Sequence, residues 1–237
     1  MNTSIKYIIA SACLFSATSA MANDHKTTIE YRHDYRDGVK KHGDRVKVFL
    51  DTGQNIGFEL DARYNNEDDG MYNHMTMNGS EFTAFYYDKI NANTNWLAGT
   101  SLDFTKEGLV YIPFVRLNYQ FDNGIRLQGR YKWKVWDYDV NGVDGTPYRS
   151  KIQQFDTFVG YRYHDWNFQY QFDIFREMES NGLPLYDDKK WDYQHNVVVT
   201  YSLNKNWRPF VEVGNIKESR YTDERQTRYR VGIKYTW

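Results

Sequence analysis

The chain has 237 residues and a formal net charge of −1, so its overall charge gives no attraction for nucleic acid. Its single cysteine, Cys13, lies near the N-terminus, which excludes a disulfide framework and a cysteine-based zinc site in the rest of the chain. Mean hydropathy is low, at −0.80, yet aromatic residues make up 18% of the chain. Tyrosine and tryptophan, which dominate that fraction, favour membrane–water interfaces.

Residues 1–22, MNTSIKYIIASACLFSATSAMA, have the features of a secretory signal peptide. Lys6 precedes an apolar run over residues 8–15, and the segment ends on the small-residue motif Ala20-Met21-Ala22. The run is too short to span a bilayer, and no later stretch approaches the roughly 20 apolar residues that a spanning helix needs. We therefore predict a signal peptide at 1–22 and one domain, residues 23–237, which could enter a membrane only as a barrel.

Beyond the leader, apolar and polar residues alternate with the period of two that is typical of β-strands with unlike faces. Ile29, Tyr31 and Tyr35 open the pattern, and Tyr235 and Trp237 close it. The alternation predicts twelve strands, at residues 29–35, 45–50, 56–64, 81–86, 96–104, 115–119, 125–135, 156–163, 166–174, 193–201, 209–213 and 228–237.

The predicted connections fall into two classes. Those after strands 2, 4, 6, 8 and 10 are short, whereas those after strands 3, 7 and 9 are long and polar: NNEDDGMYNHMTMNG, DYDVNGVDGTPYRSK and EMESNGLPLYDDKK. Short periplasmic turns and long external loops are typical of outer-membrane proteins. The prediction is an all-β fold, a transmembrane antiparallel β-barrel of twelve strands in the bacterial outer membrane.

A soluble β-sandwich or a lipocalin-like barrel would also alternate. Two features argue against a soluble fold. The first is that the polar face is heavily charged, whereas a small soluble barrel fills its interior with apolar side chains. The apolar face carries many large aromatics near strand ends, as a lipid-facing girdle does.

The final segment, RYRVGIKYTW, is expected to pair with the first strand and close the barrel. Closure leaves no backbone edge in contact with hydrocarbon. A terminal aromatic with a tyrosine two places earlier resembles the C-terminal signature of outer-membrane proteins, in which Trp237 takes the place of the usual phenylalanine.

The polar parity assigns fourteen basic and nine acidic residues to the lumen. The acids are Glu30, Asp34, Glu59, Asp61, Glu81, Asp103, Asp156, Asp173 and Glu212. Besides Arg36, the bases are the candidate pore-lining residues: Arg32, Arg45, Lys47, Arg63, Arg116, Arg126, Arg130, Lys132, Lys134, Arg162, Arg228, Arg230 and Lys234. The excess predicts a net positive lumen that attracts anions.

The bases gather on two tracks. One follows residues 126–134, where no acid interrupts the bases, and the other joins the last strand to the first, with Arg228, Arg230 and Arg32. In a ring of twelve strands these tracks lie opposite each other and could pass an anion from site to site. Arginine–glutamate networks that only stiffen the wall are the structural alternative.

Three segments, EYRHDYRDGVKKHGDRVKV, YIPFVRLNYQF and WRPFVEVGN with TDERQTRYRVGIKYTW, resemble the oligogalacturonate-specific porin family, the KdgM-like channels. A sialic-acid-inducible channel is a more distant relative. The resemblance implies a twelve-stranded, monomeric channel for acidic oligosaccharides with arginines in the pore. By position, the matching residues are Arg32, Arg116, Arg130, Arg228 and Arg230.

We therefore predict a porin for passive uptake of acidic oligosaccharides, first oligogalacturonate, with oligo-alginate or sialic acid as alternatives. An outer-membrane enzyme is a competing hypothesis, but the membrane-facing histidines, His33 and His195, have no paired serine in the pattern. A structural or adhesive barrel is a third. We expect no metal and no cofactor, and the expected partners are acidic oligosaccharides, outer-membrane lipid and lipopolysaccharide.

Overall fold

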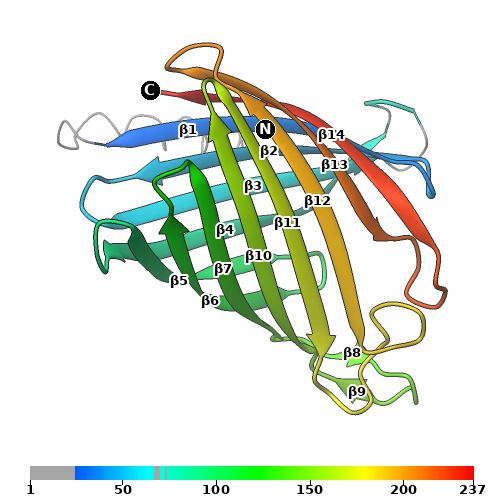
Figure 1. Cartoon of the computed structure of the whole chain (residues 1–237). Coiled ribbons are helices and arrows are strands. Elements are labelled where there is room, and N and C mark those ends of the chain that lie inside the picture. The colour runs from blue at the N-terminus through cyan, green and yellow to red at the C-terminus, as the bar shows by residue number, and fades with distance from the viewer. Residues whose placement is uncertain (1–24, 67–69, 73) are drawn as a thin grey trace, which may run out of the picture.

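The barrel is closed. The computed structural model describes residues 25–66, 70–72 and 74–237, and the predicted signal peptide lies outside them. Twelve strands pair antiparallel in the order β1-β14-β13-β12-β11-β10-β7-β6-β5-β4-β3-β2, and β2 returns to β1 (Figure 1). The predicted all-β barrel of twelve strands is confirmed.

The strands of the wall are 11 to 15 residues long. They are β1 (Lys26–Arg36), β2 (Lys41–Asp51), β3 (Ile56–Asn66), β4 (Met75–Lys89), β5 (Thr94–Phe104), β6 (Leu109–Gln120), β7 (Ile125–Trp136), β10 (Lys151–Tyr163), β11 (Trp166–Glu177), β12 (Trp191–Tyr201), β13 (Trp207–Lys217) and β14 (Arg225–Thr236). A small hairpin, β8 (Val140–Asn141) with β9 (Pro147–Tyr148), lies within the loop between β7 and β10. Within the described ranges, no helix is both long and apolar enough to cross a membrane.

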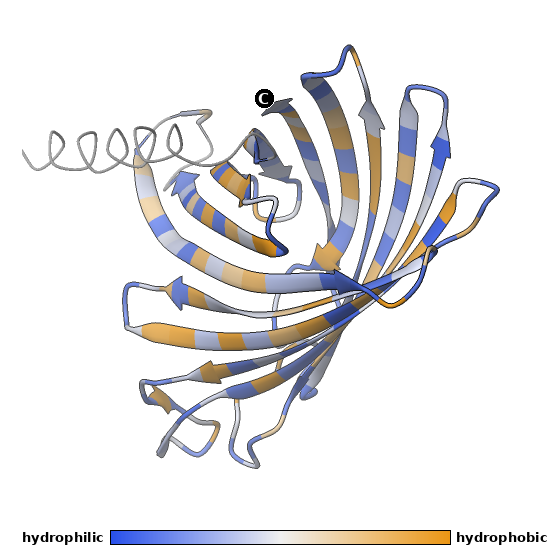
Figure 2. Cartoon of the chain, turned by 90° about the vertical axis from the view of Figure 1, so that its left-hand side faces the viewer, coloured by the Kyte–Doolittle hydropathy of each residue, from blue (hydrophilic) through white to orange (hydrophobic). Residues whose placement is uncertain are grey.

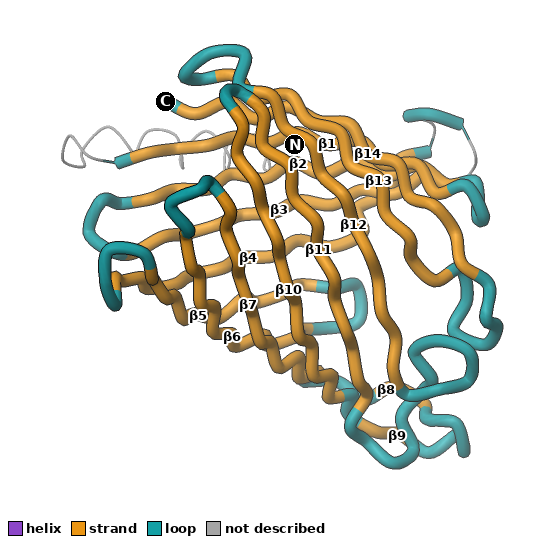
Figure 3. The backbone as a smooth tube through the Cα atoms, viewed as in Figure 1, coloured by secondary structure: helices purple, strands orange, loops and turns teal. Residues whose placement is uncertain are grey.

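The predicted strands have the right number and order, but several begin too late. The second was expected from residue 45 and begins at Lys41, the fourth begins at Met75, and the sixth begins at Leu109. These extensions lie at the end of the barrel that carries the longer loops (Figure 3). Hydropathy does not alternate there although the backbone ladder continues: residues 41–44 of β2 are polar on both faces, whereas residues 109–114 of β6, LVYIPF, are apolar on both faces.

The opposite end carries only tight turns, as predicted. The five connections there span residues 52–55, 90–93, 121–124, 164–165 and 202–206. Gly124 follows Asn123 at a φ of 86°, and His164 has a φ of 50° in the two-residue turn between β10 and β11. Such left-handed positions suit the reversal of a right-twisted hairpin. Strand β1 begins and strand β14 ends at this side, which is the periplasmic side of an outer-membrane barrel.

Burial is inverted relative to a soluble protein. Asp156 and Asp173 are 0% exposed, whereas Val197, Val211 and Val231 are 50–56% exposed. Alternating hydrophilic and hydrophobic bands run along the strands (Figure 2). A polar interior and an apolar outer band match a barrel in lipid, and the soluble sandwich or lipocalin-like alternative is wrong.

The last strand closes the ring against the first. The register runs from Thr28↔Thr236 to Arg36↔Arg228. At the periplasmic rim the Trp237 amide donates to the Thr27 carbonyl at 3.1 Å, and the Thr27 amide donates to the Trp237 carbonyl at 3.2 Å. The Tyr235 and Trp237 rings lie 5.6 Å apart. The expected closure by the terminal segment is confirmed.

Deletion of Trp237 should lower the folded yield in outer membranes, because it removes both of these backbone hydrogen bonds at the seam. Their net contribution is about 2 kcal/mol, at about 1 kcal/mol each. Heat-modifiable gel mobility measures the folded fraction.

Two control variants separate the loss of the backbone hydrogen bonds from the loss of an aromatic ring. Trp237→Ala keeps the backbone bonds and removes the ring, and Trp133→Ala removes an equally exposed outward ring from β7, far from the seam. An undiminished yield in the deletion variant would show that the seam does not depend on this residue.

Candidate functional site: the charged lumen

All thirteen candidate bases lie on barrel strands at positions of the inward parity. They are Arg32 on β1, Arg45 and Lys47 on β2, Arg63 on β3, Arg116 on β6, Arg126, Arg130, Lys132 and Lys134 on β7, Arg162 on β10, and Arg228, Arg230 and Lys234 on β14. Their cross-strand partners are inward positions too: Arg130 pairs with Asp156, and Lys234 pairs with Glu30. The structure therefore gathers the predicted set on one face of the sheet, around one lumen.

The two basic tracks face each other. In the closed ring, β7 is separated from β1 by five strands in either direction. Strand β14 is the neighbour of β1 and carries the other arginines of that track. The predicted placement on opposite walls is confirmed by the strand order.

On the β1/β14 wall, three guanidinium groups share one acid. Glu212 accepts from Arg230 at 2.5 Å, and it lies 3.7 Å from Arg228 and 3.9 Å from Arg32. Arg228 also donates to the Asn196 side-chain oxygen at 2.8 Å. One carboxylate cannot neutralise three cations, so this wall keeps a positive excess.

The neighbouring wall of β2 and β3 is balanced by contrast. Its bases form ion pairs with acids on nearby strands: Arg45 with Asp61 and Lys47 with Glu59 at 2.7 Å between β2 and β3, and Arg63 on β3 with Asp103 on β5, across β4. At the seam, Lys234 pairs with Glu30 at 3.0 Å. These contacts agree with the structural alternative, in which charge networks stiffen the wall.

The basic run on β7 is less free than its sequence indicates. No acid interrupts it along the strand, but Asp156 lies directly across from Arg130 on β10 and accepts from its Nε at 2.7 Å. Lys132 lies 3.9 Å from the same carboxylate. The register between neighbouring strands, which the sequence pattern alone does not give, supplies this partner.

Four candidates have no such partner. In the described residues, no carboxylate lies within ion-pair distance of Arg116, Arg126, Lys134 or Arg162. Arg116 also lies directly across from Arg130, so two like charges face each other on neighbouring strands. Such a pair is destabilising unless an anion comes between the two charges.

These unpaired bases extend along one wall. Arg126 and Arg162 lie beside the periplasmic turns at residues 121–124 and 164–165, Arg116 lies further from that rim, and Lys134 lies towards the end with the longer loops. The β6/β7/β10 wall therefore offers unpaired positive charge at several depths of the lumen.

Two features of the lumen escaped the sequence analysis. Arg208 has the inward parity of β13 and donates to the Thr236 hydroxyl at 2.5 Å, but it precedes the strand start that hydropathy predicted. The second feature is that cationic side chains lie over inward-facing aromatic rings: Arg130 lies 5.4 Å from the Phe158 ring centroid and Lys234 lies 5.1 Å from that of Phe210. In the sequence, the alternation along the strands already placed Phe158 and Phe210 on the polar, inward-facing side.

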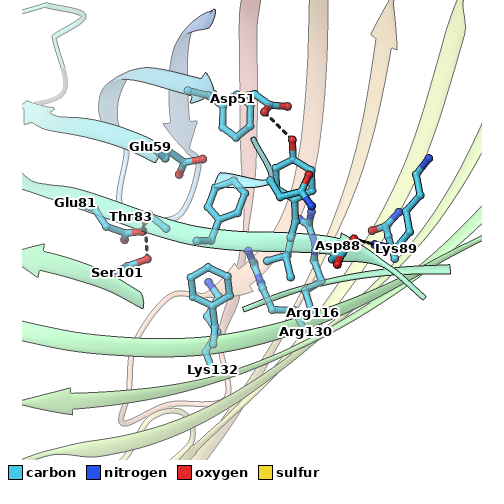
Figure 4. A pocket seen from close by; sticks show the side chains of 17 residues that line it. Asp51, Glu59, Glu81, Thr83, Asp88, Lys89, Ser101, Arg116, Arg130 and Lys132 are labelled. Carbon is cyan, nitrogen blue, oxygen red and sulfur yellow. Dashed lines mark hydrogen bonds between the residues drawn. The ribbon is translucent and has the colours of Figure 1, made fainter. Parts of the chain in front are cut away.

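A cavity of about 460 Å³ opens in the lumen along β2 to β7. Arg116, Arg130 and Lys132 line one side, and Glu59 and Glu81 line another (Figure 4). Part of the wall between them is aromatic. The lumen is therefore a space with charged and apolar surfaces together, and it is not completely filled by side chains.

The histidines of the outer face make contacts with an acid, a second histidine and a tyrosine. His33 lies 3.0 Å from Asp44 and 3.0 Å from His42, and His195 lies 2.6 Å from the Tyr170 hydroxyl. Within the described chain, no serine or threonine hydroxyl is hydrogen-bonded to these histidines. Across the same ranges, no cluster of three His, Cys, Asp or Glu residues is placed to hold a metal ion.

Comparisons with known proteins agree with this architecture. The chain is 29% identical over 230 residues to the oligogalacturonate-specific porin KdgM of Dickeya dadantii, covering 93% of this chain and 96% of that protein. It is 21% identical over 235 residues to the N-acetylneuraminic acid outer membrane channel protein NanC of Escherichia coli (strain K12), covering 96% and 97%. A solved NanC porin structure superposes with a TM-score of 0.78 at 18% identity, covering 87% of this chain and 98% of that one.

The family model described as oligogalacturonate-specific porin protein (KdgM) matches residues 18–237. These relatives are outer-membrane channels, and the barrel has the closed, inverted architecture that such proteins require. The chain is an outer-membrane porin and belongs to the KdgM family of oligogalacturonate-specific porins.

Proposed function

We propose that this porin carries acidic oligosaccharides passively across the outer membrane, through an anion-selective lumen, with oligogalacturonate as the first candidate. The observation that carries the proposal is the set of luminal bases without an acidic partner, Arg116, Arg126, Lys134 and Arg162. A guanidinium group can donate two parallel hydrogen bonds to a carboxylate, and a solute carboxylate can take that place.

The candidate solutes share a chemistry. The relative from Dickeya dadantii is named for oligogalacturonate, and the relative from Escherichia coli is named for N-acetylneuraminic acid. Both are sugars that carry a carboxylate. The higher identity, 29% against 21%, favours the oligouronate, and oligo-alginate and sialic acid are the alternative cargoes.

The rest of the proposal follows from the closed ring. Every wall strand has a partner on both sides, which leaves no strand edge for a second chain and supports a monomer surrounded by lipid and lipopolysaccharide. The proposed residues act by binding and guiding solute. The proposal assigns them no chemical step, metal or cofactor.

The channel should be anion-selective. The sequence pattern assigns fourteen basic and nine acidic residues to the lumen, and a confined positive lumen concentrates anions. In a planar bilayer with a KCl gradient, the reversal potential should lie towards the equilibrium potential of chloride. A value towards that of potassium would contradict a net positive, anion-selective lumen.

Neutralising the unpaired bases should reduce acidic-sugar flux while the barrel still folds. The triple variant Arg116→Gln, Arg126→Gln, Arg162→Gln should lower trigalacturonate uptake into liposomes about tenfold, because each change removes a charge that no protein acid balances. Uptake of a neutral trisaccharide, measured on the same folded protein, should change little.

The matched control is Arg63→Gln, which removes one luminal charge that Asp103 pairs. It leaves a carboxylate unpaired, so it should lower folded yield more than it changes solute preference. If the triple variant lost charged and neutral uptake equally, the unpaired bases would be bracing the wall.

A further inference from the structure

An aromatic surface lines the lumen beside the unpaired Arg116. Phe49 on β2, Phe85 and Tyr87 on β4, and Phe114 on β6 all have the inward parity and border the same cavity. The rings of Phe49 and Phe85 are stacked, with centroids 6.0 Å apart and planes inclined by 21°. Tyr87 continues the series at 6.2 Å from Phe85. These three neighbouring rings form a broad apolar surface, here called the aromatic platform (Phe49, Phe85, Tyr87).

Two glycines let the platform lie low against the wall. Gly57, Phe85 and Gly99 are cross-strand neighbours on β3, β4 and β5. A Cβ atom at Gly57 would collide with the Phe85 ring, and one at Gly99 would collide with the Phe85 Cβ atom and backbone. The ring therefore packs against bare backbone and leaves its other side towards the cavity.

The platform is further fixed by its polar edge. The Tyr87 hydroxyl donates to the Asp51 carboxylate at 2.7 Å, which orients the ring at the periplasmic end of the surface. Asp51 lies in the last position of β2, beside the turn to β3.

Positive charge lies next to this apolar surface. Phe114 is the cross-strand partner of both Gly99 and Lys132, and Arg116 follows two positions along the same strand. Arg116, Arg130 and Lys132 project into the cavity from the wall beside the platform (Figure 4). Of these three, Arg116 is the one without an acidic partner in the described residues, and its Nε is buried without a hydrogen bond.

Other aromatic rings in the lumen differ from those of the aromatic platform in their contacts with cations. Phe158, Phe175 and Phe210 each have a cation over the ring, at 5.1 to 5.4 Å from the centroid. Within the described structure, no cation lies over Phe49 or Phe85. Their ring faces are half-exposed to a cavity of about 460 Å³, a volume within the range of small-molecule sites.

We propose that the aromatic platform and Arg116 form a binding subsite for one pyranose ring of an acidic sugar. The C–H groups of a pyranose ring carry slight positive charge and pack on the negative face of an aromatic ring. The sugar would lie on Phe49 and Phe85, and its carboxylate would accept hydrogen bonds from the Arg116 guanidinium. This subsite rests on the proposed function, because it names the place where that cargo pauses in the lumen.

The subsite explains how a charged channel can discriminate sugars from other anions. Bases alone attract any anion, chloride and small carboxylates included. Stacking adds attraction only for solutes with an apolar ring face. The interaction is weak enough for release, which passage through a channel requires.

The experiment compares a sugar anion with an anion that has no ring. Block of ion current by trigalacturonate and by tricarballylate, which carry three carboxylates each, is measured on single channels of the wild type and of Phe85→Leu. The variant should need about threefold to tenfold more trigalacturonate for half-block. The half-blocking concentration of tricarballylate should stay within about twofold, since leucine changes no charge.

The matched control is Phe82→Leu, which alters a ring on the same strand at the opposite parity, where Phe82 stacks on Phe58 at 6.2 Å. It should leave both half-blocking concentrations unchanged. Arg116→Gln should weaken block by both anions. Phe49→Leu, an independent change on β2, provides the same test if Phe85→Leu folds poorly.

The outcomes separate the subsite from the proposed function. Equal loss for both anions in Phe85→Leu, or no loss for either, would overturn the subsite and leave the aromatic platform as wall packing. Wild-type channels that pass chloride but neither bind nor admit trigalacturonate would overturn the proposed function and the subsite together. Selective loss of trigalacturonate block in both platform variants would support the subsite.

Discussion

Backbone hydrogen bonding in a solvent that offers none is the constraint on which the whole structure depends. An unpaired amide or carbonyl facing hydrocarbon costs several kcal/mol, so a sheet can cross a membrane only if it has no edge. The pairing of β14 with β1 satisfies this condition, over a register of nine residue pairs from Thr28 to Arg36. Once the ring is closed, the lipid requires apolar side chains outside, and the polar half of each strand must face the lumen.

That inversion makes the lumen a place where charges interact at close range with little water between them. Most luminal acids are consequently engaged: Asp61 with Arg45, Asp156 with Arg130, and Glu212 with three arginines. Within the described residues Glu81 and Asp173 form no ion pair with a base, and Arg116, Arg126, Lys134 and Arg162 form none with an acid, so the unpaired bases outnumber the unpaired acids. In the proposed function a solute uses these unpaired bases rather than all the bases, because a base held by a protein carboxylate must exchange that partner before it binds another.

In the proposed function, therefore, some luminal bases brace the wall while others guide solute, and they lie on different strands. The β2/β3 wall is paired by Asp61, Glu59 and Asp103. On the β6/β7/β10 wall, Arg116, Arg126, Lys134 and Arg162 have no ion-pair partner in the described residues, whereas Arg130 pairs with Asp156. The cavity that reaches from Phe49 on β2 to Lys132 on β7 has acids on one side, bases that include the unpaired Arg116 on the other, and aromatic rings between them. A sugar acid, which has one apolar face and one charged group, presents the matching pattern.

The sequence by itself determined the twelve strands, their order, the inward parity of the thirteen bases and the identity of the closing segment, because a period of two in hydropathy is a local property of the chain. It missed the outer ends of strands such as β2 and β6, where no alternation remains because both faces are polar at residues 41–44 and both are apolar at residues 109–114. Only the tertiary structure decided that Asp156 faces Arg130 while Arg116 faces another arginine, and that Phe85 lies over Gly57. These contacts join different strands, and the register between strands is set by closure of the whole ring.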